Sequence, residues 1–173
     1  KKSKKYDVII TVMSNMGLEN FLKNKLKLKI KRTSVGDINV INEMKKYKSI
    51  LGGEQSGHII FSNYSNTGDG ILAALKITEI INSSEVKVSK LFNLYKEYSQ
   101  KKINLTYKIK NTGLIKIVED INKNKSFNNK NIRSLVRFSG TEPLIRILVE
   151  GKNKNIVKSN SDQIKKLVRK KIG

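Results

Sequence analysis

In the first half of the chain, apolar residues occur alternately in short strand-like runs and at helical spacing. "DVIITVM" (residues 7–13) is a β-branched run typical of a buried strand, and polar turn residues follow it. "LENFLKNKL" then has helical spacing, which predicts one apolar face made of Leu18, Phe21, Leu22 and Leu26. "LKIKRT" predicts a second strand, and "INVINEMKKY" predicts a second helix. This β-α-β-α order indicates an α/β layer.

Three short polar segments lie beside apolar runs. "SILGGEQSGHIIFS" (residues 49–62) predicts a strand, a polar turn and a strand. "VGD" and "TGDG" each place an aspartate before a helical run, so Asp37 and Asp69 are predicted N-caps. The helix after Asp69 has the strongest apolar stripe of the chain, which is formed by Ile71, Leu72, Leu75 and Ile80.

The order of predicted elements changes after a charged stretch at residues 97–102, which we interpret as a domain boundary. Strands are predicted at "INLTYKIK", "RSLVRF" and "PLIRILVE", with helices near "GLIKIVEDINK" and over residues 155–172. "NKNKSFNNKN" is predicted to be a flexible polar loop. The fold class expected is therefore an α/β mixed-sheet domain over residues 1–98, followed by a small α+β domain over residues 99–173.

The net charge of +22 raises the question of nucleic-acid binding. Only five of the 36 basic residues are arginine, however, and the lysines are spread along the whole chain. Arginine is the residue that makes bidentate contacts to bases and phosphates, whereas lysine is a solvated point charge. A solvated lysine-rich surface is therefore the favoured interpretation, and a nucleic-acid binder remains the alternative.

Composition also limits the cellular setting. The chain has no cysteine, which excludes disulfides and thiolate metal sites and fits a reducing, cytoplasmic location. No apolar run approaches the length of a membrane span, and the first residues do not have the pattern of a signal peptide. Because the sequence starts without methionine, we expect a piece of a longer polypeptide.

The run "GGEQSGH" holds the only histidine of the chain. If the run is extended, Glu54, Ser56 and His58 leave the backbone on one side. A carboxylate accepts hydrogen bonds and an imidazole can donate them, which suits the hydroxyl groups of a sugar. An ordinary surface histidine is the alternative.

The segment "RFSGTEPLIR" predicts a turn between two strands. Strand alternation would place Arg137 and Arg146 beside a turn that contains Ser139, Gly140 and Thr141. Two guanidinium groups, two hydroxyls and several backbone N–H groups would bind a phosphate dianion. The alternative is a plain hairpin with solvated arginines. The five aspartates are scattered, and no serine lies in a recognisable nucleophile setting, so no catalytic or metal-binding residue is predicted in this stretch.

Five segments, "TVMSNMGLE", "RTSVGD", "GGEQSGH", "TGDG" and "RFSGTEPLIRILVEG", resemble in content and order the C-terminal part of the phosphoglucosamine mutases of the α-D-phosphohexomutase superfamily. The resemblance implies most of a third domain, incomplete at its N-terminus, and a fourth domain. It implies that Glu54, Ser56 and His58 contact the sugar. It also implies that the non-reacting phosphate is held by Arg137, Ser139, Gly140, Thr141 and Arg146.

The same resemblance implies an isomerase that interconverts glucosamine 6-phosphate and glucosamine 1-phosphate, on the route to UDP-N-acetylglucosamine and cell-wall precursors. Family members use an upstream phosphoserine, an upstream Mg²⁺ loop and a hexosamine bisphosphate as intermediate and activator. The expected partners are the phosphosugar and the missing N-terminal domains of the same enzyme, with no membrane or nucleic-acid partner. Ser34 and Ile38 stand where members usually carry Lys and Arg. The alternatives are a phosphomannomutase or phosphoglucomutase of the same superfamily, or a non-catalytic sugar-phosphate-binding remnant.

Overall fold

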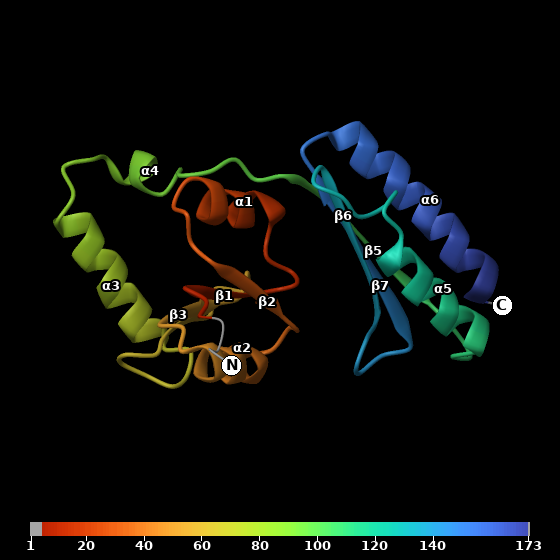
Figure 1. The fold of residues 1–173 in the computed structure, drawn as a ribbon, viewed down its shortest axis with the longest axis horizontal. Helices are drawn as coiled ribbons and strands as arrows, with labels where there is room; N and C mark the ends of the chain where they lie inside the picture. The colour runs from red at the N-terminus through yellow and green to blue at the C-terminus, as the bar shows by residue number, and fades with distance from the viewer. Residues whose placement is uncertain (1–4, 173) are drawn as a thin grey trace. The chain divides into compact units, whose positions relative to one another are not determined.

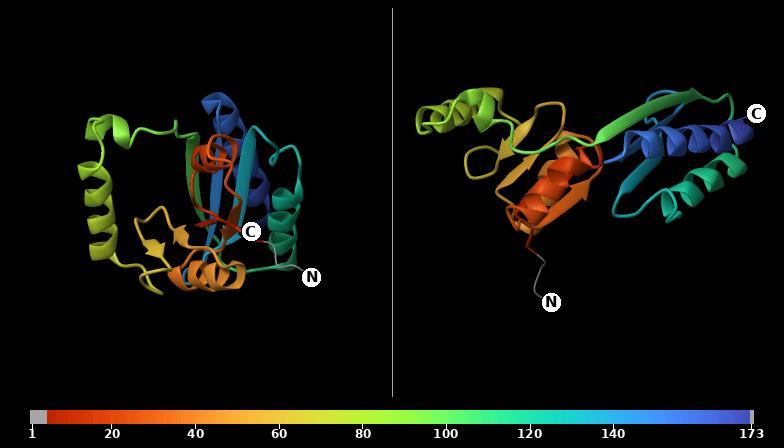
Figure 2. Two further views of the ribbon diagram at one scale, coloured as in Figure 1. Left: turned by 60° about the vertical axis from the view of Figure 1, so that its left-hand side comes forward. Right: turned by 90° about the horizontal axis from the view of Figure 1, so that it is seen from above.

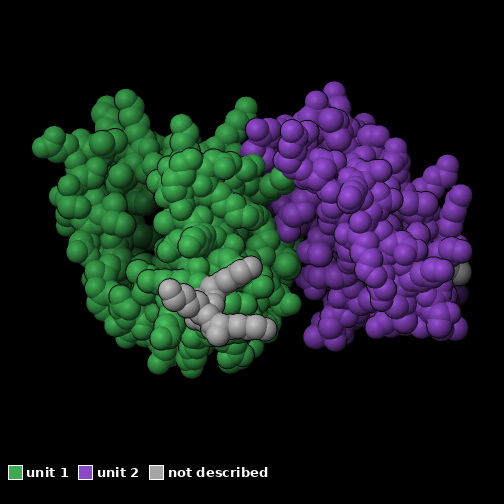
Figure 3. All heavy atoms as spheres, viewed as in Figure 1, with its two compact units in different colours: residues 1–97 green, residues 98–173 purple. Residues whose placement is uncertain are grey.

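The chain divides into two compact units, Lys1–Glu97 and Tyr98–Gly173 (Figure 3). The structure, a computed structural model, describes residues 5–172. Unit 1 contains a mixed sheet between helices, and unit 2 contains an antiparallel sheet with helices on one face. The predicted fold class, a mixed-sheet α/β domain followed by a small α+β domain, is therefore confirmed.

Unit 1 is built on a four-stranded sheet with the order β2-β1-β3-β4. Its strands are β1 (Val8–Thr11), β2 (Ile30–Thr33), β3 (Leu51–Gly53) and β4 (Ile59–Phe61). The strand β1 pairs in parallel with both β2 and β3, and β4 closes the sheet as the antiparallel partner of β3. The crossover helices α1 (Met16–Asn24) and α2 (Asp37–Tyr47) lie on opposite faces of this sheet (Figures 1 and 2).

Two small apolar clusters hold these layers together. Ile9, Val40, Met44 and Ile60 form the cluster between the sheet and α2. On the other face, toward α1, the cluster consists of Val8, Ile10 and Ile30, with Leu22, Leu28 and Leu51 packed against it. Gly52 lies on the α2 side, where a Cβ atom would come within 2.4 Å of Met44 Sδ. Glycine at this position therefore lets α2 approach β3 closely.

Helix α3 (Gly70–Asn82) begins as the sequence predicts. Asp69 is its N-cap, and the Asp69 carboxylate accepts a hydrogen bond from Leu72 N–H at 3.0 Å. The predicted apolar stripe is not buried, because Ala73 alone among the residues of α3 is buried and Ile71 is 77% exposed. A short helix that the sequence did not reveal, α4 (Val88–Leu91), follows α3.

Unit 2 is an antiparallel sheet with the order β5-β7-β6. Its strands are β5 (Ser99–Thr106), β6 (Ile132–Phe138) and β7 (Leu144–Gly151). Helices α5 (Thr112–Lys123) and α6 (Lys154–Ile172) pack on one face of this sheet. The core between sheet and helices is aliphatic, and it includes Val136, Ile145, Ile147, Leu114 and Ile164.

Three local predictions were wrong. Strand β5 begins at Ser99 rather than at Ile103, because residues 99–102 also pair with β7. Leu26 lies beyond the end of α1 and is 51% exposed, since the chain turns at Lys27, where φ is +57°. The asparagine-rich loop is tied to the core, because it carries the buried Phe127. None of the helices within residues 5–172 is long and apolar enough to cross a bilayer.

Candidate functional site

The run "GGEQSGH" forms the turn of the β3–β4 hairpin. Glu54 N–H donates to His58 O at 2.9 Å, and Gly57 N–H donates to Glu54 O at 3.2 Å. Gly57 has a φ of +99°, a conformation that glycine adopts without a steric penalty. The predicted strand, polar turn and strand are therefore confirmed, whereas the polar run is not extended, because the antiparallel pairing of β3 and β4 closes it into a tight turn.

The turn nevertheless brings the three predicted side chains together. His58 Nδ1 lies 3.8 Å from Glu54 Oε2, and Ser56 Oγ lies 3.5 Å from the same oxygen. The His58 side chain is 57% exposed, whereas that of Glu54 is 10% exposed. The turn thus presents an imidazole to solvent above a largely buried carboxylate.

Asp37 joins this cluster from another element. Its Oδ1 lies 3.1 Å from His58 Nδ1. The prediction that Asp37 is an N-cap is wrong, since Asp37 is the first residue of α2 and Gly36, at φ +117°, occupies the cap position without a side-chain hydrogen bond. Gly36 N–H donates instead to Glu54 Oε1 at 2.8 Å, which ties the start of α2 to the hairpin turn.

A third segment borders the same cluster. Gly68, in "TGDG", lies so close that a Cβ atom there would be 3.5 Å from His58 Cβ and 3.9 Å from Asp37 Oδ2. "VGD", "GEQSGH" and "TGDG" are therefore parts of one site in unit 1. From the sequence, "VGD" and "TGDG" were interpreted as helix caps. The signal that linked them to "GEQSGH" was that all three occur among the segments that resemble the family.

The ligand atoms of Asp37, Glu54 and His58 lie within 4.8 Å of one another. Among the described residues this is the group of imidazole and carboxylate atoms compact enough to share a metal ion. Mg²⁺ prefers oxygen ligands in a near-octahedral arrangement. An imidazole with two carboxylates, one of them bonded to Gly36 N–H, does not fit that preference, and we assign no Mg²⁺ to this chain.

The second predicted loop is the hairpin between β6 and β7 in unit 2. Arg137 and Arg146 are direct partners in the register of the two strands. Burial, together with the positive charge of Arg146, lowers the pKa of the Arg137 guanidinium. Like charges placed directly opposite each other in a sheet are destabilising. The repulsion between the two arginines therefore destabilises the sheet, and a bound anion would offset it.

The loop between these strands offers hydrogen-bond donors. Ser139 N–H closes the hairpin by donating to Leu144 O at 2.7 Å. The hydroxyls of Ser139 and Thr141, and the N–H groups of Gly140 and Thr141, make no hydrogen bond with residues 5–172. A Cβ atom on Gly140 would meet no protein atom within 4 Å, so the space beside Gly140 is open.

The two arginines differ in how free they are. The Arg146 guanidinium binds Glu142 Oε2 through Nη2 at 2.7 Å, across an exposed ion pair. The Arg137 guanidinium makes no ion pair or hydrogen bond within the described part of the chain. One cation is therefore free, and the other is held by an acid that faces solvent.

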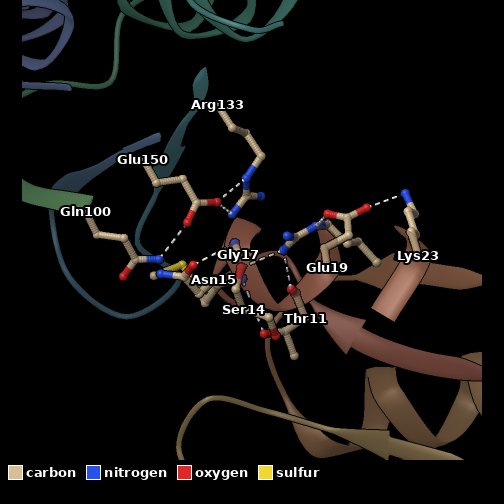
Figure 4. A network of polar contacts seen from close by, with 11 residues as sticks. Thr11, Ser14, Asn15, Gly17, Glu19, Lys23, Gln100, Arg133 and Glu150 are labelled. Carbon is tan, nitrogen blue, oxygen red and sulfur yellow. Dashed lines mark hydrogen bonds and ion pairs between the residues drawn. The ribbon is translucent and has the colours of Figure 1, made fainter. Parts of the chain in front are cut away.

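Two other arginines are structural. Arg133 binds Glu150, a fully buried carboxylate that also accepts a hydrogen bond from Gln100 Nε2 at 2.7 Å (Figure 4). In unit 1, Arg32 Nε binds Glu19 Oε2 at 2.7 Å, and Arg32 Nη1 donates to the carbonyl of Thr11 at 2.9 Å. These side chains hold strand ends in place, so their role differs from that of the Arg137 and Arg146 pair.

Family models match both halves of the chain. Residues 1–98 match phosphoglucomutase/phosphomannomutase, alpha/beta/alpha domain III, and residues 101–167 match the C-terminal domain of the same family. The chain belongs to the phosphoglucomutase/phosphomannomutase family. The match extends over nearly all of the chain and includes every segment of both loops.

Curated relatives within this family carry the name phosphoglucosamine mutase. The chain is 40% identical to the protein of Clostridium beijerinckii over 98% of its length, and 41% identical to that of Lawsonia intracellularis over 95%. It spans 39% and 37% of those relatives, whose C-terminal parts it matches.

Solved structures of the family share the fold. A phosphoglucomutase/phosphomannomutase family protein from Burkholderia thailandensis has a TM-score of 0.75 at 16% identity, and 96% of this chain and 38% of that one are covered. An N-acetylphosphoglucosamine mutase from Aspergillus fumigatus, solved with GlcNAc-6P and magnesium, has a TM-score of 0.73 at 17% identity, with 97% of this chain and 40% of that one covered.

Proposed function

We propose that the chain is the C-terminal part of a phosphoglucosamine mutase, an isomerase that interconverts glucosamine 6-phosphate and glucosamine 1-phosphate. The observation that carries the binding half of this proposal is the Arg137 and Arg146 pair beside a loop of unpartnered donors. The choice of amino sugar is supported by the name of the relatives at about 40% identity.

In this proposal the β6–β7 loop binds the phosphate that is not reacting. Arg137 and Arg146 supply charge, while Ser139, Gly140 and Thr141 supply hydroxyl and N–H donors. Burial and then repulsion by Arg146 lower the pKa of Arg137, and a dianion between the two guanidinium groups would offset both effects. Glu142 would give up Arg146 when the anion arrives, since their ion pair is exposed and of low energetic value.

The β3–β4 turn binds the sugar. Ser56 and His58 are exposed, and the largely buried Glu54 carboxylate lies beside them. Hydroxyl and amino groups of a hexosamine are donors as well as acceptors, so a carboxylate, a hydroxyl and an imidazole can all bind them.

The reaction itself uses groups outside this chain. A phosphoserine would pass its phosphoryl group to a sugar hydroxyl: the serine O–P bond breaks, a sugar O–P bond forms, and the hydroxyl proton leaves to a base. The hexosamine bisphosphate intermediate then reorients in the site and returns its other phosphoryl group to the serine. The phosphoserine and the Mg²⁺ loop are proposed to lie in domains that precede Lys1. This chain contributes positioning and electrostatic stabilisation.

A second candidate is a sugar-phosphate-binding protein without catalysis. It is favoured by Ser34 and Ile38, which lie on either side of Asp37 and are both exposed, Ile38 to 63%. Two cations that family members carry there are missing. In this case the chain binds hexosamine phosphates, but the complete polypeptide does not turn them over.

The phosphate loop can be tested with two matched variants in the complete polypeptide. Arg146→Ala removes a charge-assisted contact and should weaken glucosamine 6-phosphate binding by about 1.5–3 kcal/mol. Glu142→Gln releases Arg146 from its ion pair and should leave binding unchanged or strengthen it by up to about 1 kcal/mol. Calorimetric titration measures both. Unchanged affinity in Arg146→Ala would refute the assignment of this loop.

A further inference from the structure

We propose that Asp37 is a positioning residue that fixes His58 in its Nδ1–H tautomer and thereby turns Nε2 into a hydrogen-bond acceptor for a ligand hydroxyl. The tautomer follows from the geometry of unit 1. The identity of the ligand as a sugar rests on the proposed function.

The first step is the contact itself. Asp37 Oδ1 lies 3.1 Å from His58 Nδ1, within hydrogen-bonding distance. A carboxylate at neutral pH accepts hydrogen bonds and cannot donate them. The proton in this contact must therefore lie on Nδ1, and in the neutral ring Nε2 then carries the lone pair.

The second step is the choice between two carboxylates near the ring. Glu54 Oε2 lies 3.8 Å from His58 Nδ1, beyond hydrogen-bonding distance. Glu54 Oε1 accepts Gly36 N–H, and Oε2 is approached by Ser56 Oγ at 3.5 Å. Glu54 thus holds the turn against the start of α2, and Asp37 holds the ring.

The third step is to identify which ring nitrogen of His58 a ligand can reach. His58 is 57% exposed, and its Nε2 has no hydrogen-bond partner within residues 5–172. Gly68 lies on the Cβ and Cγ side of the residue, where an added Cβ atom would be 3.5 Å from His58 Cβ and 3.9 Å from His58 Cγ. The nitrogen left for a ligand is therefore Nε2.

This arrangement has a consequence for specificity. A neutral imidazole whose Nε2 is an acceptor can bind a hydroxyl that donates its proton. It cannot bind a phosphate oxygen that is itself only an acceptor. Asp37 would thus direct the loop toward the sugar hydroxyls rather than toward the phosphate.

The tautomer can be observed directly, because the chain contains a single histidine. We would label that histidine with nitrogen-15 and record the imidazole nitrogen shifts at a pH where the ring is neutral. In the unsubstituted chain, Nδ1 should have the shift of a protonated nitrogen and Nε2 that of an unprotonated one. In Asp37→Ala the Nε2–H form preferred by a free histidine side chain should become the major one. The matched control is Asn39→Ala, which alters the same turn of α2 but removes only a hydrogen bond to Val35 O, so the tautomer should not change.

An Nε2–H ring in the unsubstituted chain, or an Nδ1–H ring that persists in Asp37→Ala, would overturn the proposal. Adding glucosamine 6-phosphate then tests the proposed function separately. A changed Nε2 shift that inorganic phosphate alone does not produce supports contact with a hydroxyl. No change would remove His58 from the sugar site while leaving its tautomer assigned, and an equal change with inorganic phosphate would overturn the specificity for hydroxyls.

Discussion

At the scale of single residues, the three arginines of the unit 2 sheet differ in role: Arg133 is structural, whereas Arg137 and Arg146 are proposed to bind a ligand. Arg133 and Arg137 lie on the same strand and, four residues apart, on the same face of the sheet. Arg133 is bound to the buried Glu150, whereas Arg137 faces another arginine. Residue type alone does not separate them, and the strand register does.

This difference predicts opposite responses to the same substitution. In phosphate-free buffer, Arg137→Gln should leave the free energy of unfolding unchanged or raise it by up to about 0.5 kcal/mol, because it relieves a like-charge pair. The rise in melting temperature that inorganic phosphate gives to the unsubstituted chain should be lost. Arg133→Gln, the matched control, should cost about 3 kcal/mol because it leaves Glu150 buried without its cation. Thermal unfolding with and without phosphate measures both, and an undiminished phosphate effect in Arg137→Gln would contradict the site.

Glu19 makes a second residue-scale prediction, about pH. Burial would raise the pKa of this carboxyl, but the hydrogen bond from Lys23 and the charge of Arg32 outweigh burial and hold the pKa below its ordinary value. A carboxyl whose folded-state pKa is depressed stabilises the fold above its unfolded-state pKa and loses that effect as pH falls through the folded-state pKa.

Glu19→Gln should therefore lower the free energy of unfolding at pH 7 by about 1–2 kcal/mol. The difference between the two proteins should be fully present above about pH 5 and should shrink in more acidic solution. Denaturant unfolding across this range measures it. A difference that stays constant as the pH falls would show that the contribution of Glu19 is not one of charge.

At the scale of elements, the position of Asp37 depends on how closely α2 packs on β3. Gly52 permits that approach, since a Cβ atom would come within 2.4 Å of Met44 Sδ and 2.8 Å of Val40 Cγ1. Gly52→Ala should cost about 1–3 kcal/mol of stability through overpacking. It should also weaken the contact between Asp37 and His58, which the imidazole nitrogen shifts would report. Gly140→Ala is the control, because its Cβ would meet no protein atom and stability should not change.

The elements were largely predictable because periodicity reports which face is buried. Strands β6 and β7 and helices α5 and α6 lie close to the predicted runs, and their alternation placed Arg137 opposite Arg146. The turn at Glu54 was not predictable in detail, because its shape depends on strand pairing and on the positive φ of Gly57. The role of Asp37 was missed because an aspartate before a helical run has the pattern of a cap, and its partner His58 is 21 residues away.

At the scale of the whole molecule, the chain corresponds to the C-terminal part of longer relatives. It spans 39% of the C. beijerinckii relative, and its two units match two successive domains of the family. In the proposed function, each unit offers one loop with a distinct chemistry: hydroxyl recognition at the β3–β4 turn and phosphate recognition at the β6–β7 turn. Two such loops would suit a substrate that carries both a sugar ring and a phosphate, and we propose that phosphoryl transfer depends on residues outside the chain.

The most direct test of this account is an assay of the complete polypeptide that carries the chain, supplied with glucosamine 6-phosphate, a hexosamine bisphosphate activator and Mg²⁺. The account predicts formation of glucosamine 1-phosphate, with a higher kcat/KM than for mannose 6-phosphate or glucose 6-phosphate under the same conditions. Faster turnover of either neutral hexose phosphate would assign the protein to another branch of the family. Binding of glucosamine 6-phosphate without any turnover would contradict the mutase and leave a sugar-phosphate-binding protein.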